Sequence, residues 1–251
     1  MANFTWPLVD AAPATAVAPR HSVLVRITHW VSTLGFLALL LSGAEIVISH
    51  PRFYWGETGN VMTPSLFDLP IPASRPWVNT GYGFVLPDQN GWSRNLHFEA
   101  AWVILFTGFV YVIYGVLRGH FRENLLPTGA GLTGKAMARD IAHHVLFRRP
   151  HAAEDSSYNI LQRVTYLLVI FVLFPLAIWT GLAMSPAVVS VFPILATLFG
   201  GVQSARTIHF FVSVFLTLFL LIHVIMFCRA GFSNRMRAMI TGRVVSRKGG
   251  S

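Results

Sequence analysis

Four long apolar segments constrain the fold of this chain more than any other feature of its sequence. A helix needs about 20 apolar residues to cross the hydrocarbon core of a bilayer, and each of the four segments has that length. Only 12% of the 251 residues are charged, whereas a soluble domain carries about a quarter. The sequence therefore predicts an all-α integral membrane protein, a single domain built as a four-helix bundle with spans at about 24–48, 96–117, 160–184 and 206–228.

The distribution of Lys and Arg predicts how these spans are oriented. Six Lys or Arg residues follow the fourth span and six lie between the second and third, whereas the stretch 49–95 has three and the stretch 185–205 has none. Because cytoplasmic loops of membrane proteins collect basic residues, we expect both termini in the cytoplasm and residues 49–95 as a long outward loop. The formal net charge of +9 has the same explanation and does not predict nucleic-acid binding.

The regions outside the spans carry weaker signals. Residues 1–20 are rich in Ala and Pro and lack the apolar run of a signal peptide, so we expect a disordered lead-in. The apolar run 187–199 is too short to span a bilayer, and we expect it to lie at the interface or to re-enter the membrane. The tryptophans of the outward loop fit an interfacial belt and also a surface that docks a partner, and the sequence leaves both open for Trp55, Trp77 and Trp92.

Four of the ten histidines lie within the predicted spans. His209 and His223 are fourteen residues apart on the fourth span, which is a rise of about 21 Å with both side chains within about 40° of one direction. On the orientation given above, His97 and His209 lie at the outer depth of the membrane, and His29 and His223 lie at the inner depth. An intramembrane ionisable group is costly and is usually paired. The sequence therefore predicts two histidine pairs at two levels.

Paired imidazoles at two levels suit two b-type haems, because each haem iron takes one axial ligand on either face of the ring. We therefore expect four haem ligands, and the apolar interior of a bundle can hold the flat macrocycle. The single cysteine, Cys228, excludes the paired cysteines of a c-type haem attachment. Arg26, Arg94 and Arg206 lie where haem propionates would emerge. Four glycines could allow a close approach of the ring, although glycines are also ordinary in transmembrane packing: Gly35, Gly43, Gly108 and Gly181.

Two other interpretations of the histidines stay open. They could be polar residues that join helices through hydrogen bonds. They could also serve a His-dependent proton or ion transporter without haem, which would need ionisable groups through the middle of the membrane. The middle of the predicted bundle is apolar, and Glu45 and Glu99 lie near its outer ends.

Several motifs of the sequence resemble those of the prokaryotic di-haem cytochrome b family, which includes membrane subunits of nickel–iron hydrogenases, formate dehydrogenase and thiosulfate reductase. The resemblance covers residues 20–245, and its most specific element is the pair of histidines separated by thirteen residues in the fourth span. The segments RITHW and RNLHFEAAW hold the other two histidines, while YNILQRVTY, TGLAMSP and HPRFYWGE extend the likeness.

The resemblance implies a subunit of the bacterial inner membrane that carries two haem b groups. It would exchange electrons between the quinone pool and a periplasmic redox protein, such as a molybdopterin enzyme, a hydrogenase or a cytochrome. Catalytic chemistry on the outer substrate would belong to that partner. The resemblance leaves open a stand-alone cytochrome that passes electrons from quinol to a small periplasmic oxidant. A homodimer in the membrane lipid is also left open.

The resemblance also implies a quinone site on the cytoplasmic side, beside the haem between His29 and His223. Asn159 matches the family position that contacts the quinone. The same residues also fit a capped helix start with an arginine that extends to the interface. Three polar neighbours of Asn159 complete the predicted quinone site: Tyr158, Gln162 and Arg163.

Overall fold

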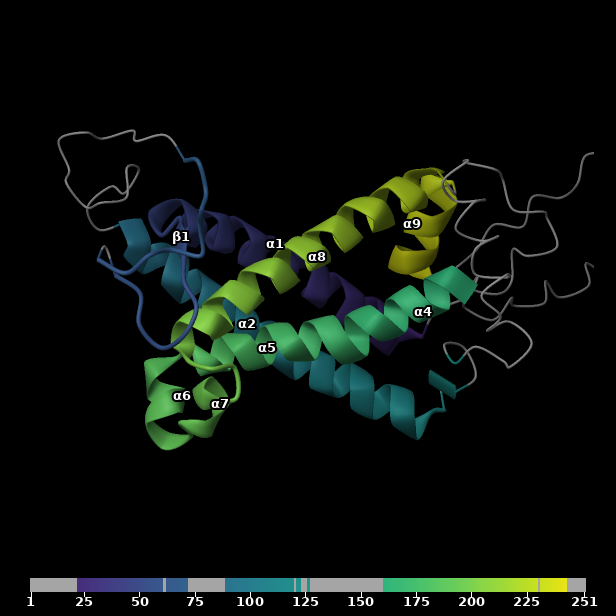
Figure 1. Cartoon of the computed structure of the whole chain (residues 1–251). Coiled ribbons are helices and arrows are strands. Elements are labelled where there is room, and N and C mark those ends of the chain that lie inside the picture. The colour runs from purple at the N-terminus through teal and green to yellow at the C-terminus, as the bar shows by residue number, and fades with distance from the viewer. Residues whose placement is uncertain are drawn as a thin grey trace, which may run out of the picture.

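The computed structural model describes residues 22–60, 62–71, 89–119, 121–122, 126, 160–229 and 231–242. The predicted lead-in at 1–20 lies outside these residues. In the part of the chain that the structure describes, four helical segments are long and apolar enough to cross a membrane, and they run lengthwise through the molecule (Figure 1). The prediction of an all-α bundle with four spans is confirmed. The segments are α1 (Val23–Ser49), α2 (Gln89–Leu117), the run from α4 (Ile160–Leu168) through η4 (Val169–Leu173) to α5 (Phe174–Ala183), and α8 (Val202–Arg229).

The third span contains a π-helical turn, η4, directly before Pro175. Proline has no backbone N–H and its ring collides with the carbonyl four residues earlier, so an α-helix must bend or widen at that point. The chain widens: the N–H of Phe174 donates to the carbonyl of Val169, five residues back. The distortion at Pro175 is thus a wider turn that keeps the helix continuous.

The spans pack as two pairs. Close backbone contacts run mainly between α1 and α2 and between α5 and α8. Gly35 permits the first pairing, because a Cβ at that position would lie 3.1 Å from the side chain of Ile104. Midway along the bundle, Phe36 of α1 meets Phe174 of α5 with ring centres 6.3 Å apart. These rings belong to an apolar layer around Val169, Val212 and Leu216.

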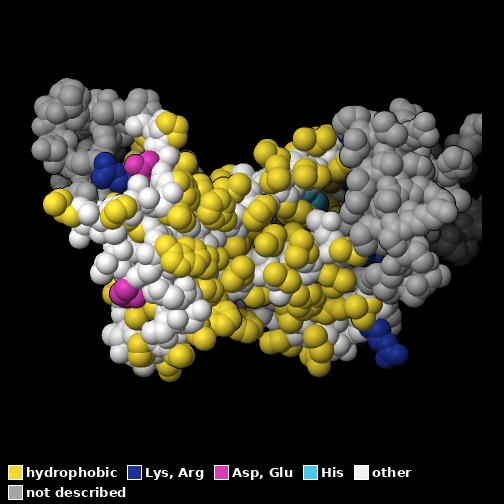
Figure 2. Space-filling view, viewed as in Figure 1, with side chains coloured by type: hydrophobic (Ala, Val, Ile, Leu, Met, Phe, Trp, Pro, Cys, Tyr) yellow, Lys and Arg dark blue, Asp and Glu magenta, His cyan; other side chains and the backbone are white. Residues whose placement is uncertain are grey.

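The surface of the bundle is that of a protein embedded in lipid. Figure 2 shows apolar side chains over the central part of the visible face, with the charged side chains near its two ends. Large apolar residues of the spans are widely exposed, among them Leu34 at 67% and Phe106 at 62%. A water-soluble monomer rarely exposes such a continuous apolar surface. This apolar surface therefore suits contact with the hydrocarbon of a bilayer.

The end of the bundle that the sequence predicts to face outward, called the outer end below, carries a small hairpin and two short helices. Strands β1 (Arg52–Phe53) and β2 (Phe67–Asp68) pair antiparallel, and Phe53 stacks on Phe67 with ring centres 4.7 Å apart. The apolar run at 187–199 forms α6 (Pro186–Val191) and α7 (Ile194–Thr197), beside the end of α5 (Figure 1). This run does not cross the bundle, as its length predicted.

A further helix that the sequence did not indicate, α9 (Phe232–Thr241), lies at the opposite end (Figure 1). Gly231 precedes it in the left-handed region with φ 98°, a conformation that glycine adopts without strain. The turn there brings α9 against the start of α1, where the indole N–H of Trp30 donates to the carbonyl of Met239 at 3.3 Å.

Candidate functional site

The structure brings the four histidines of the spans together in the two pairs predicted. The ring centres of His97 and His209 are 6.2 Å apart with an interplanar angle of 65°. Those of His29 and His223 are 6.5 Å apart at 56°. An imidazole nitrogen lies about 2 Å from a metal ion that it ligates, so two imidazoles on opposite sides of one ion have ring centres roughly 6 Å apart. Both pairs fit a single metal ion between them.

The ligand set of each pair suits haem better than a bare metal ion. Among the described residues, no group of three or more His, Cys, Asp or Glu side chains could hold a metal ion. Two imidazoles alone leave most coordination positions of a metal unfilled, whereas a porphyrin supplies four nitrogens and needs only two axial ligands. The residues present therefore fit haem at both levels.

The histidines reach across the space between the two helix pairs. His97 lies on α2 and His29 on α1, while both partners lie on α8, and few Cα atoms of α8 approach those of α1 or α2 closely. A group held between the histidines would therefore be ligated from both helix pairs.

The backbones of the two other helices lie directly against the outer imidazoles. A Cβ at Gly43 of α1 would lie 3.4 Å from Cε1 of His97, and one at Gly181 of α5 would lie 3.6 Å from Cε1 of His209. A Cβ at Gly108 would meet nothing within 4 Å. Of the four glycines noted in the sequence, Gly43 and Gly181 therefore adjoin the outer imidazoles. Gly108 faces open space, and Gly35 serves helix packing.

A buried hydroxyl fixes the tautomer of His97. Ser42 is fully buried, and its Oγ donates to the carbonyl of Ala38 at 2.7 Å. The Oγ also lies 3.0 Å from Nδ1 of His97. A hydroxyl has one hydrogen, so Nδ1–H of His97 donates to Oγ. The lone pair is left on Nε2, the atom that would face the metal.

The same arrangement recurs at His209. Thr180 is fully buried, and its Oγ1 donates to the carbonyl of Leu176 at 2.7 Å. Its distance to Nδ1 of His209 is 2.9 Å. Metal-ligating histidines usually donate their second ring N–H in this way, which orients the ring and raises its basicity. Sequence reasoning missed both hydroxyls, although each directly precedes a glycine that packs on a histidine, as Ser42–Gly43 and Thr180–Gly181.

The outer arginines predicted to hold propionates converge on one residue, His50. Arg94 and Arg206 lie three residues before the outer histidines, so each is about one helical turn nearer the outer surface. Nη2 of Arg94 lies 3.5 Å from Nε2 of His50, and Nη2 of Arg206 donates to the carbonyl of His50. The guanidinium of Arg206 also lies 5.2 Å from the centre of the Phe53 ring. The structure thus gathers both arginines at the outer end.

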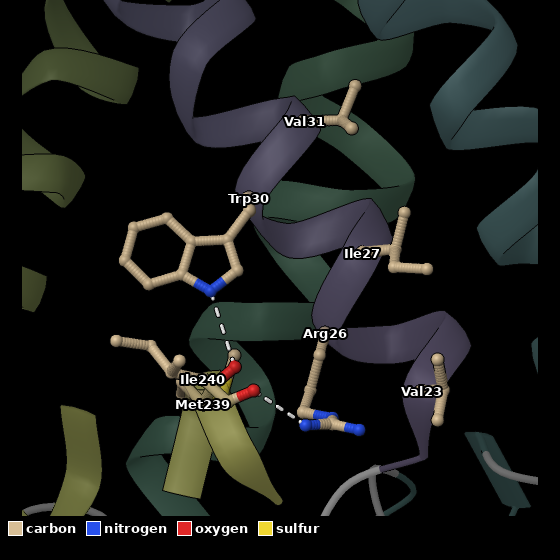
Figure 3. Close-up of a pocket in the computed structure, with 7 residues that line it drawn as sticks. All are labelled: Val23, Arg26, Ile27, Trp30, Val31, Met239 and Ile240. Carbon is tan, nitrogen blue, oxygen red and sulfur yellow. Dashed lines mark hydrogen bonds between the residues drawn. The ribbon is translucent and has the colours of Figure 1, made fainter. Parts of the chain in front are cut away.

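Arg26, the inner arginine, lies three residues before His29 and points toward α9 (Figure 3). Its Nη1 donates to the carbonyl of Ile240 at 2.7 Å. Its Nε is buried and has no hydrogen-bond partner among the residues that the structure describes, so one donor remains available to an anionic oxygen. The side chain lines a pocket of about 380 Å³ together with Val23, Ile27, Trp30, Val31, Met239 and Ile240.

The predicted quinone residues fall mostly outside the described part of the chain. Tyr158 and Asn159 lie outside the described residues, and so does the side chain of Gln162. Arg163 lies near the start of α4, where its Nη1 donates to the carbonyl of Leu126 at 3.3 Å. The quinone site therefore stays a prediction.

The outer segment HPRFYWGE caps the helix that carries His209 and His223. The carboxylate of Glu57 accepts from the N–H of Val202 at 3.2 Å, and the N–H of Gly56 donates to Oγ of Ser204 at 2.7 Å. A helix start has unpaired N–H groups and a positive dipole end, which this segment satisfies. Gly201 makes the contact feasible, because a Cβ there would lie 2.5 Å from the carbonyl carbon of Gly56. The segment thus fixes where α8 begins.

Comparison with known proteins identifies the family of this chain. Residues 20–242 match the family model described as prokaryotic cytochrome b561, and the chain belongs to that family. It is therefore a multi-pass membrane cytochrome, an electron-transfer subunit with b-type haem, as the family resemblance of the sequence predicted.

The chain is also similar to a curated protein of Azospira oryzae named putative protein-methionine-sulfoxide reductase subunit YedZ1. The two are 27% identical over 211 residues, a stretch that covers 82% of this chain and 88% of the relative. No solved structure matches the chain.

Proposed function

We propose that this chain is a quinone-linked electron-transfer subunit that carries two b-type haems in one membrane domain. It would exchange electrons between a periplasmic redox protein and the quinone pool of the bacterial inner membrane, with both termini in the cytoplasm. The observation that supports this most strongly is the pair of ring-centre distances, 6.2 Å at His97–His209 and 6.5 Å at His29–His223. Each distance suits an iron ligated from both sides.

The protein's own residues would hold, space and insulate the two centres. When bound, b-type haem supplies a one-electron redox centre. His209 and His223 on one continuous helix fix the two levels about 21 Å apart. Val212 and Leu216 are buried in the apolar layer between these levels. That layer keeps ionisable groups from the middle of the bundle, which disfavours the alternative of a proton or ion transporter.

Arginines near each pair are proposed to bind the haem carboxylates. Arg94 and Arg206 would serve the outer haem, since both lie one turn outward of its ligands. Arg26 would serve the inner haem, because its buried Nε is a donor with no partner among the described residues. Charge-assisted bonds from guanidinium to carboxylate are among the strongest hydrogen bonds that proteins form.

The partner and the quinone site are proposed from the name of the relative, an exposed tryptophan and the family resemblance. The name of the Azospira oryzae relative favours a reductase as the periplasmic partner, which would draw electrons outward from quinol. Trp55, 60% exposed in the capping segment of α8, would contact such a partner. By the family resemblance, the quinone would bind at the inner end near Arg163, with Tyr158, Asn159 and Gln162.

Quinol reduction of the haems tests this function. Purified protein in detergent should show reduction of both haems when a reduced quinone is added anaerobically. His223→Ala should abolish that reduction while leaving the outer haem reducible by dithionite. Unchanged quinol reduction in His223→Ala would contradict the proposed inner entry point.

A further inference from the structure

His50 occupies a bridging position that its place in an outer loop did not suggest. It is the C-cap residue of α1, and its N–H donates to the carbonyl of Ile46 at 3.0 Å. Two other atoms of His50 meet arginines: the ring Nε2 meets Arg94 of α2, and the carbonyl meets Arg206 of α8. One fixed residue thus contacts arginines from both helix pairs.

The chemistry of His50 suits an acceptor between two cations. Nη2 of Arg94 lies 3.5 Å from Nε2 of His50. Because a guanidinium group can only donate, the lone pair of the neutral ring is assigned to Nε2 and its hydrogen to Nδ1. Burial lowers the pKa of His50, and the charges of Arg206 and Arg94 lower it further. The ring is therefore uncharged at neutral pH and can accept a hydrogen from Arg94.

We propose that His50 is a positioning residue that holds Arg94 and Arg206 together as one anion-binding fork above the outer histidine pair. Arginine side chains lose rotamer freedom when they bind, and fixing them beforehand reduces that cost. The two guanidinium groups also repel each other, and a neutral acceptor between them offsets this. The inference rests on the proposed role of both arginines in binding the carboxylates of the outer haem.

The test is a double-mutant cycle read as the midpoint potential of the outer haem in an anaerobic redox titration. A cation near the haem disfavours the ferric state, so Arg94→Leu should lower the potential. His50→Leu should lower it in the same direction, because Arg94 is no longer held. The double variant should shift no further than Arg94→Leu alone, since coupled residues are not additive.

Two controls separate the roles of the side chain and the backbone of His50. His50→Gln, whose amide oxygen can accept from Arg94, should restore much of the wild-type potential. Arg206 bonds the backbone of His50, so the shifts of Arg206→Leu and His50→Leu should add. The potential of the inner haem should not change in any of these variants.

The outcomes separate the inference from the proposed function. No shift in potential and no loss of haem in Arg94→Leu would contradict the propionate role itself. A shift in Arg94→Leu with a wild-type potential in His50→Leu, or an additive double variant, would overturn the role of His50 alone. If His50→Leu does not fold, a folded His50→Gln with the full shift of Arg94→Leu would overturn it equally.

Discussion

The outer and inner histidine pairs have nearly the same separation of ring centres and very different surroundings. At the outer pair, both imidazoles donate to buried hydroxyls, those of Ser42 and Thr180. At the inner pair, the hydroxyl of Thr33 donates to the backbone carbonyl of His29. His223 packs beside the ring of Phe219 and has no hydrogen-bond partner among the described residues. The separation of the rings suits an iron ion at both pairs. The hydrogen bonds differ between the pairs, and they decide how rigidly the ligands of each iron are held.

This difference has a physical consequence for the two redox centres. An imidazole whose second N–H is hydrogen-bonded is oriented and more basic, and a more basic ligand favours ferric iron. The outer ligands are fixed in this way before any cofactor binds. His223, one of the inner ligands, lacks this constraint. It lies at the end of the bundle where the quinone is proposed to bind. The following predictions are designed to break or sharpen this contrast.

Removing one ligand from each pair should give the largest effect. His97→Ala should lose the outer haem and keep the inner one, and His223→Ala should do the reverse. Each variant should therefore contain half the haem of the wild type, measured by extraction and absorbance. Wild-type haem content in either variant would show that the pairs are assigned wrongly.

Crowding the outer imidazole should give the next largest effect. A Cβ at Gly43 would already lie 3.4 Å from His97, so Gly43→Val should displace the ring and lower the outer haem content. Gly43→Ala, whose Cβ makes an ordinary contact, is the matched control and should keep most of the haem. Equal haem content in the two variants would mean that α1 does not hold His97 in place.

Deleting the buried hydroxyls should change the potential of the outer haem without removing it. Ser42→Ala and Thr180→Val each remove the acceptor for Nδ1–H, so the potential should rise by tens of millivolts, equivalent to about 1 kcal/mol for one hydrogen bond. Thr33→Val is the control at the inner pair, because its hydroxyl bonds a backbone carbonyl. Identical shifts at both haems would remove the distinction between the pairs.

Neutralising the carboxylate at the start of α8 should give the smallest effect. Glu57→Gln weakens the interaction with the helix dipole, which costs about 0.5 kcal/mol. The loss of haem absorbance on heating should begin at a slightly lower temperature in the variant. The difference from wild type should shrink in high salt, because salt screens exposed charges. A difference independent of salt would point to lost packing instead.

The sequence predicts the spans and the pairing of the histidines because both follow from one-dimensional rules. Span length follows from the bilayer, and the depth of His209 and His223 follows from the helix rise. Ser42 and Thr180 were missed because a buried hydroxyl in a membrane helix ordinarily bonds the carbonyl four residues back. Both hydroxyls do so here, and only the structure shows their second bond to a histidine.

The outer end was harder to predict because its contacts join residues that are distant in the chain. His50 and Glu57 look like solvated loop residues in the sequence, yet they meet α8 about 150 residues later. Helix α9 is hard to predict for a different reason: its arginines fit the cytoplasmic charge signal and give no separate indication of a helix. Its turn depends on the left-handed conformation of Gly231, which composition does not indicate.

The most direct test of two haems between paired histidines is the haem count of the purified protein. The protein should be isolated in detergent from cells grown with adequate haem, and its dithionite-reduced minus air-oxidised spectrum recorded with the haem extracted and counted per chain. Two non-covalent b-type haems per chain is the predicted result. One haem per chain would contradict the assignment of one pair, and a featureless spectrum from folded protein would contradict the role of both.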